Sequence, residues 1–120
     1  MINLYEKYLK NESRKKNIFI LTAENKLALG NIPDHKILDV GICEQNLIGI
    51  GTGLASESFK VITTTFAPFQ TIRCCEQIKV NLGYMKHKIC MVGLASGLVL
   101  GTFGYTHCCI EDIGILRSIP

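Results

Sequence analysis

Apolar positions along the chain fall into short unbroken runs separated by longer, mixed segments. Four runs have the length of a strand and are continuously apolar or β-branched: residues 17–22, 36–40, 60–65 and 88–94. Unbroken runs are typical of strands covered on both faces, because a half-exposed strand would alternate apolar and polar side chains. The pattern therefore predicts four strands of a buried, mostly parallel sheet.

The mixed segments between the runs predict helices. Amphipathic helical spacing is found in three of them: residues 4–9, 44–56 and 69–82. Gly83 is expected to close the third helix. Thr106 is expected to cap one more helix, because Glu111 and Asp112 would lie in its early turns, where the helix dipole favours carboxylates. Strands alternating with helices predict the α/β class, with a doubly wound, mostly parallel sheet and flanking helices.

Ligands of such sheets bind beyond the carboxyl ends of the strands. A glycine cluster after the second run, at Gly49, Gly51 and Gly53, is similar to a dinucleotide-binding fingerprint. The fingerprint requires a third glycine three residues after the second, where this chain has Leu54, and its glycines directly follow a strand. We therefore interpret these glycines as helix positions at which another helix approaches closely.

The composition narrows the class of protein. Hydrophobic residues make up 48% of the chain and charged residues 19%, which excludes a disordered segment. The net charge is only +3 and the basic residues are dispersed, so no binding to nucleic acid is predicted. Residues 89–110 carry no formal charge and are long enough to span a membrane. Polar residues and glycines interrupt them, so we expect a buried strand and a glycine-rich loop, and no membrane segment.

Cysteine thiols are the most nucleophilic side chains that the chain offers. The six cysteines are interpreted as buried free thiols: Cys43, Cys74, Cys75, Cys90, Cys108 and Cys109. Adjacent cysteines on a helix point about 100° apart, so the spacing does not favour a zinc site. Nothing in the sequence selects one cysteine as a nucleophile beside His107. Residues 1–16 show no secretory leader, and the cytoplasm is therefore the predicted compartment.

Glu44 is the acidic residue whose position points most directly to chemistry. It stands after the second predicted strand, in the first turn of an otherwise apolar, glycine-rich helix. Two interpretations stay open from its position alone. The carboxylate can interact with the helix dipole, or it can lie in a dry crevice and share a proton with a nitrogen of a ligand.

Three blocks of the sequence resemble one family in its order and spacing. They are DVGICEQNLIGIGTGLA at residues 39–55, TFAPFQTIRCCEQI at residues 65–78, and the segment from GTFGYTH to LRSIP at residues 101–120. The blocks are similar to the pyrimidine-binding domain of transketolases and deoxyxylulose-phosphate synthases. The nearest resemblance is to transketolases split into two chains. The resemblance implies the thiamine-diphosphate-binding fold and thiamine diphosphate as the cofactor.

The resemblance also implies roles for individual residues. Glu44 matches the glutamate that hydrogen-bonds N1′ of the aminopyrimidine and so activates the cofactor through its own ring. Phe69 matches the aromatic residue that stacks on the pyrimidine, and His107 matches a histidine that faces the sugar. The residues implied are Glu44 and His107 as catalytic, and Phe69, Phe66, Glu24 and Ile42 as cofactor-binding.

Departures from the family pattern concern the other half of the cofactor site. The chain has no Gly-Asp-Gly motif, which the family uses on a different domain to hold Mg²⁺ and the diphosphate. The resemblance therefore implies a partner chain, the diphosphate-binding subunit of a split transketolase, and a homo- or hetero-oligomer. It also implies that residues 1–120 form a pyrimidine-binding domain that is incomplete at its carboxyl-terminal end, because the family's sheet continues with further strands.

The resemblance predicts transfer of a two-carbon ketol unit between sugars or sugar phosphates. Phe103 replaces a residue that is often acidic in transketolases and that contacts the donor, so ordinary ketose-phosphate specificity is not predicted. Two alternatives stay open. One is a deoxyxylulose-phosphate-synthase-like carboligase, and the other is a truncated, non-catalytic interaction module.

Overall fold

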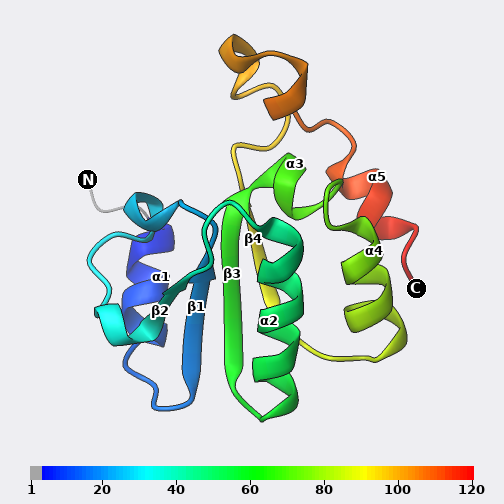
Figure 1. The fold of residues 1–120 in the computed structure, drawn as a ribbon. Helices are drawn as coiled ribbons and strands as arrows, with labels where there is room; N and C mark the ends of the chain where they lie inside the picture. Colours follow the sequence, from blue (N-terminus) through cyan, green and yellow to red (C-terminus); the bar gives the residue numbers. More distant parts are fainter. Residues whose placement is uncertain (1–3) are drawn as a thin grey trace.

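The computed structural model describes residues 4–120 and forms one sheet with helices on both sides (Figure 1). The strands are β1 (Ile18–Thr22), β2 (Ile37–Asp39), β3 (Lys60–Phe66) and β4 (Cys90–Leu94). They lie in the order β2-β1-β3-β4, and every neighbouring pair is parallel. The predicted α/β class and its parallel sheet are confirmed.

Helices cover both faces because side chains alternate along the strands. On one face, Leu9 of α1 (Leu4–Glu12) packs with Ile20 and Ile62. On the other face, Leu47 of α2 (Glu44–Ser56) packs with Leu21 and Val61. All these side chains are at most 1% exposed, so the sheet is buried on both faces, as its unbroken apolar runs predict.

The prediction of one continuous helix over residues 69–82 is wrong. The segment consists of α3 (Ala67–Gln70), α4 (Cys75–Gln77) and a π-helix, η3 (Ile78–Tyr84), which runs past Gly83. The N–H and the hydroxyl of Thr71 both donate to the carbonyl of Ala67, at 3.0 and 2.7 Å. The N–H of Arg73 donates to the carbonyl of Pro68 at 3.2 Å. The bond of the Thr71 N–H keeps the helical spacing of four residues, whereas the bond of the Arg73 N–H spans five, so the regular pattern ends there and the chain turns after α3.

The last helix, α5 (Asp112–Arg117), begins later than predicted, and Thr106 does not cap it. Thr106 lies in a short 3-10 turn, η5 (Tyr105–His107), and Glu111 occupies the N-cap position of α5. The chain is extended between the two because Cys109 exchanges two backbone hydrogen bonds with Gly97, both at 2.8 Å. This isolated antiparallel bridge separates Thr106 from the helix.

Two further interpretations need correction. A Cβ at Gly51 would lie 3.3 Å from Val61, so this glycine lets α2 approach the sheet and not another helix. Cys74 and Cys109 are buried as predicted, whereas Cys43 and Cys90 are exposed. Cys43 precedes α2 at the rim of the sheet, and Cys90 begins an edge strand, so neither has a layer above it. Within residues 4–120, no helix is long and apolar enough to cross a membrane.

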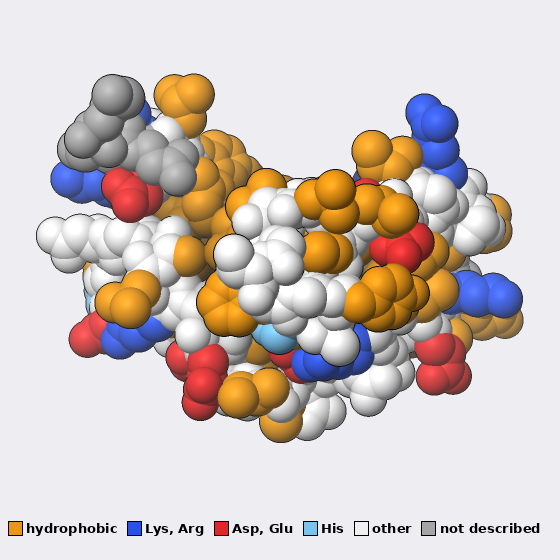
Figure 2. Space-filling view, turned by 90° about the horizontal axis from the view of Figure 1, so that it is seen from above, with side chains coloured by type: hydrophobic (Ala, Val, Ile, Leu, Met, Phe, Trp, Pro, Cys, Tyr) orange, Lys and Arg blue, Asp and Glu red, His pale blue; other side chains and the backbone are white. Residues whose placement is uncertain are grey.

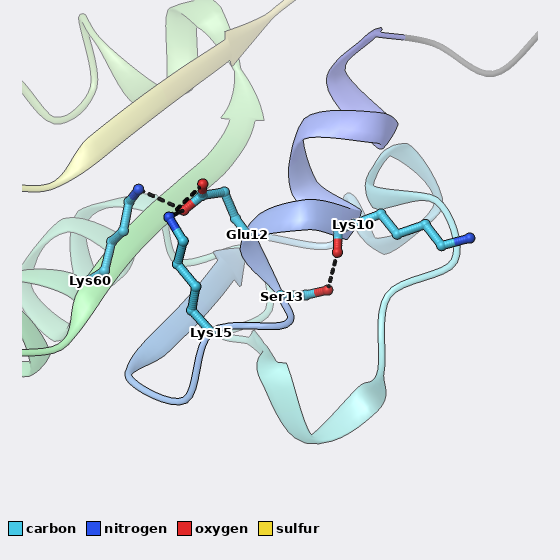
Figure 3. Close-up of polar contacts among 5 residues, drawn as sticks. All are labelled: Lys10, Glu12, Ser13, Lys15 and Lys60. Carbon is cyan, nitrogen blue, oxygen red and sulfur yellow. Dashed lines mark hydrogen bonds and ion pairs between the residues drawn. The ribbon is translucent and has the colours of Figure 1, made fainter.

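A buried carboxylate ties α1 to the sheet at the end opposite the strand carboxyl termini. Glu12 is 9% exposed and accepts hydrogen bonds from Lys60 at 2.6 Å and from Lys15 at 2.9 Å (Figure 3). These bonds, with Lys60 first, hold the pKa of Glu12 below its usual value, and the bond to Glu12 raises the pKa of Lys60. The pair therefore fixes the end of α1 on the start of β3.

Glu12→Gln is expected to lower the free energy of unfolding by about 1 kcal/mol at neutral pH, the upper range for partly exposed ion pairs. Because the pKa of Glu12 is lowered in the folded state, its contribution is present above the unfolded pKa of about 4.3 and is lost as pH falls through the folded value. Urea unfolding should therefore separate the variant from the wild type more at neutral pH than at about pH 3. Glu57→Gln, an exposed position, serves as the control. An equal loss at both pH values would contradict the assignment to the ionised carboxylate.

Candidate functional site

The carboxyl ends of all four strands lie at one edge of the sheet, the upper edge in Figure 1. A hollow of about 190 Å³ opens there between the ends of β1, β2 and β3. Its lining residues come from three separate segments: Ala23, Glu24, Asn25, Ile42, Glu44, Phe66 and Phe69. Five of the six residues singled out in the sequence thus line one hollow.

Glu44 forms the acidic wall of this hollow. It is the first residue of α2, and it is 4% exposed. Its Oε2 accepts a hydrogen bond from Arg73 Nη1 at 2.7 Å. Within the described chain, no hydrogen bond reaches its Oε1. The carboxylate therefore lies at the helix N-terminus and at the hollow at once, so the two interpretations of its position are compatible, and one oxygen stays available to a ligand.

Aromatic rings form the wall opposite Glu44 and the rim of the hollow. The rings of Phe66 and Phe69 lie edge to face with centroids 6.2 Å apart. His107, half-buried in η5, contacts Phe69 at 5.1 Å and Phe66 at 6.5 Å between ring centroids. The ring of Phe103 lies 5.3 Å from His107 at an interplanar angle of 30°. His107 does not line the hollow itself but stands next to it, on the loop that follows β4.

Glu24 and Ile42 are the more open members of the site. Ile42 is 68% exposed, and Glu24 is exposed with a positive φ of 53°. Asp39 shapes both segments, because its Oδ1 accepts hydrogen bonds from the N–H groups of Glu24 and Gly41, each at 3.0 Å. Asp39 therefore joins the ends of β1 and β2 beneath the hollow. Its role is not visible from the sequence, where its position indicates only the last residue of a strand.

Arg73 is the main site residue that sequence reasoning missed. Besides its bond to Glu44, its guanidinium carbon lies 4.0 Å from the centroid of the Phe69 ring. Arg73 also lines two adjoining hollows, of about 410 and 300 Å³. Arg73 falls inside the family-like block at residues 65–78, but nothing in its spacing from Glu44 indicates that the two side chains meet.

Cysteine chemistry is not favoured at this site. Burial, together with the nearby Glu44 carboxylate, raises the pKa of Cys74 to about 12, so its thiol stays protonated. Among residues 4–120, no group of three or more His, Cys, Asp or Glu side chains is arranged to hold a metal ion. Of the two carboxylates that line the hollow, Glu24 is exposed and Glu44 is buried.

The rim of the site is apolar and raised. The segment between β4 and α5 rises above the sheet in Figure 1, and Figure 2 looks down on this edge and shows apolar side chains gathered there. Its most exposed apolar residues are Leu98, Val99, Phe103, Tyr105 and Ile110, at 71%, 73%, 66%, 87% and 72%. The hollow is thus bordered on one side by a surface that a folded domain usually covers.

The fold and this hollow define a doubly wound α/β domain that presents a buried carboxylate and an aromatic ring at the carboxyl end of its sheet. The chain matches the family model for the transketolase pyrimidine-binding domain over residues 8–120. It therefore belongs to the transketolase family, as a pyrimidine-binding domain, and this family depends on thiamine diphosphate. The family resemblance inferred from the sequence blocks is confirmed.

The relatives include subunits of two-chain transketolases. The chain is 34% identical over 101 residues to an apulose-4-phosphate transketolase subunit of Phocaeicola vulgatus, with 82% of this chain and 32% of the relative covered. It is 35% identical over 85 residues to a 6-deoxy-6-sulfo-D-fructose transketolase subunit of a Clostridium species, with 71% and 26% covered. The fold matches a split-gene transketolase described as an inactive β4 tetramer, with a TM-score of 0.79, 26% identity, and 97% and 39% covered. The chain thus spans about a third of the length of these proteins.

Proposed function

We propose that this chain supplies the aminopyrimidine half of a thiamine diphosphate site in a two-chain, transketolase-like transferase that moves a two-carbon ketol unit between sugars. One observation carries the proposal. Glu44 is buried, yet within the described chain its Oε1 accepts no hydrogen bond, and Glu44 lines the same hollow as Phe69. A planar aminopyrimidine needs these two contacts, a carboxylate for a ring nitrogen and a flat ring for stacking.

The residues of the hollow suit such a ring. Phe66, Phe69 and Ile42 offer apolar surface, and Glu44 offers the only carboxylate in the described lining that is buried. When bound, thiamine diphosphate supplies the nucleophilic carbon of the reaction. Glu44 would hold a proton at the ring nitrogen, Phe69 would orient the ring, and the apolar walls would exclude water. His107, at the rim, would face the substrate.

A partner chain is the second part of the proposal. The described residues offer no acidic cluster for Mg²⁺, so we assign the metal and the diphosphate to a diphosphate-binding subunit. The matched relatives named as transketolase subunits support a two-chain enzyme, and the neighbour described as an inactive β4 tetramer supports an isolated chain without activity. All six cysteines are free, which fits the proposed cytoplasmic compartment.

The substrate is proposed only as a sugar or sugar phosphate. The names of the two relatives specify different sugars, apulose 4-phosphate and 6-deoxy-6-sulfofructose, so relatives of this chain differ in their substrates. Phe103 stands at the rim, where its ring lies beside His107. Deoxyxylulose-phosphate synthases also match the chain, but less closely than the transketolase subunits do, and no feature of the hollow favours them.

Isothermal titration calorimetry tests the division between the two chains. The purified chain, with Mg²⁺ present, is expected to show no micromolar binding of thiamine diphosphate, because residues 4–120 hold no cluster for the Mg²⁺ that would anchor the diphosphate. Adding a separately expressed diphosphate-binding subunit with a Gly-Asp-Gly motif is expected to produce micromolar binding. The subunit mixed with the Glu44→Gln chain is the control, and it should bind more weakly. Micromolar binding by the chain alone would contradict the proposed division, and no binding by the mixture would contradict the proposed function.

A further inference from the structure

Arg73 contacts both functional walls of the hollow without standing in it. Its Nη1 donates to Glu44 Oε2 at 2.7 Å, and its guanidinium lies over the Phe69 ring at 4.0 Å from the ring centroid. Arg73 is not among the residues that line the 190 Å³ hollow. One planar cation thus connects the carboxylate and the aromatic ring from outside, while the space between them stays open.

The backbone of Arg73 is fixed from two directions. Its N–H donates to the carbonyl of Pro68 at 3.2 Å, in the turn that ends α3. Its carbonyl accepts a hydrogen bond from the Gln45 side chain of α2 at 3.2 Å. The turn that breaks the predicted long helix therefore places Arg73 between the helix that carries Glu44 and the helix that carries Phe69.

The charges of Glu44 and Arg73 explain why an arginine suits position 73. Glu44 is almost fully buried, so its ionised carboxylate needs a cation or several hydrogen bonds to stay in place. Arg73 supplies the cation at Oε2 and leaves Oε1 for a ligand. A guanidinium can bond to a carboxylate and stack flat on a ring at the same time, whereas an ammonium cannot.

We propose that Arg73 is a positioning residue that holds Glu44 and Phe69 in the geometry an aminopyrimidine requires. This inference rests on the proposed function and deepens it. It states that the affinity of the site for the pyrimidine depends on a residue that does not itself contact the pyrimidine. Without Arg73, the Glu44 carboxylate loses its cation and turns toward water, and the Phe69 ring loses the group packed on its face.

The test uses the full chain and the pyrimidine half of the cofactor, 4-amino-5-hydroxymethyl-2-methylpyrimidine, as the probe. Saturation-transfer NMR titration is expected to give a millimolar dissociation constant for the wild type. Arg73→Met keeps the length of the side chain and removes its charge, and it is expected to bind about tenfold more weakly, the scale of a lost hydrogen bond to a charged group. Arg73→Lys keeps the charge without the planar guanidinium and is expected to bind the probe with intermediate affinity. Arg14→Met, which removes an exposed arginine at the far end of the sheet, should match the wild type.

Each outcome decides between the two proposals. If the wild type binds the probe in a way that Glu44→Gln abolishes, and Arg73→Met binds as well or better, the proposed function stands and the positioning role is overturned. If Arg73→Lys binds the probe as tightly as the wild type, the planar guanidinium is not needed at position 73 and the role is overturned as well. If neither the wild type nor any variant binds, the pyrimidine site is wrong and the role of Arg73 is wrong with it. Amide NMR spectra unchanged outside the site show that the variants fold.

Discussion

Glu44→Gln is expected to slow exchange of the C2 proton of bound thiamine diphosphate at least roughly a hundredfold in the reconstituted two-chain complex, the usual contribution of a positioned acid or base. Glutamine has the size of glutamate and still hydrogen-bonds, so the hollow keeps its shape. It cannot carry the charge that holds a proton at the ring nitrogen. Because Glu44 is 4% exposed, water cannot easily replace the lost carboxylate.

Proton–deuterium exchange followed by NMR after rapid quenching measures this step without turnover of a sugar. Glu57→Gln is the matched control, because Glu57 is exposed at the other end of the same helix. Its exchange rate should equal that of the wild type. Exchange in the Glu44→Gln complex within about threefold of the wild type, at saturating cofactor, would remove Glu44 from proton transfer.

The strands of this fold could be predicted because burial on both faces leaves a strong signal in the sequence. The expected run at residues 17–22 corresponds to β1 (Ile18–Thr22), and the run at 60–65 corresponds to β3 (Lys60–Phe66). The helix after β3 could not be predicted in the same way. Its apolar spacing looks continuous, but the hydroxyl of Thr71 adds a second bond to the carbonyl of Ala67, and the N–H of Arg73 takes the carbonyl of Pro68, five residues earlier, out of the helical pattern. Hydrophobic periodicity does not report such local competition.

The candidate site could also be predicted only in part from the sequence. Glu44 and Phe69 could be inferred because each lies in a block that resembles the family. The contact that joins them could not, since Arg73 meets Glu44 only after the chain has formed β3 and turned at the end of α3. Asp39 is a similar case, because its two hydrogen bonds depend on the neighbouring ends of β1 and β2. Residues that position others depend on tertiary contacts and leave little trace in local sequence.

The start of α3 packs closely against β4 at Gly93. Gly93 lies in β4, and a Cβ built there would be 3.1 Å from the Cα of Ala67 and 3.2 Å from its Cβ. Ala67 is the first residue of α3, two positions before Phe69, and Gly93 pairs with Thr65 in the sheet. Backbone therefore faces backbone at this point, and no flexible side chain can move aside.

Gly93→Val is expected to lower the free energy of unfolding by about 3 kcal/mol, near the top of the range for overpacked sites. Strand propensity predicts the opposite sign, because valine is favoured over glycine in strands, so the sign separates the clash from propensity. Gly49→Val is the control, since a Cβ at Gly49 meets no heavy atom within 4 Å, and its effect should stay within about 0.5 kcal/mol. Urea unfolding followed by circular dichroism measures both variants.

The same substitution should also reach the pyrimidine site, because a shift of α3 that relieves the clash moves the Phe69 ring with it. Under conditions in which Gly93→Val is still folded, its affinity for the aminopyrimidine probe is expected to fall at least about tenfold, as for a displaced stacking ring. Gly49→Val should bind the probe like the wild type. A Gly93→Val chain of wild-type stability and affinity would show that α3 is not held against β4 as closely as the structure indicates.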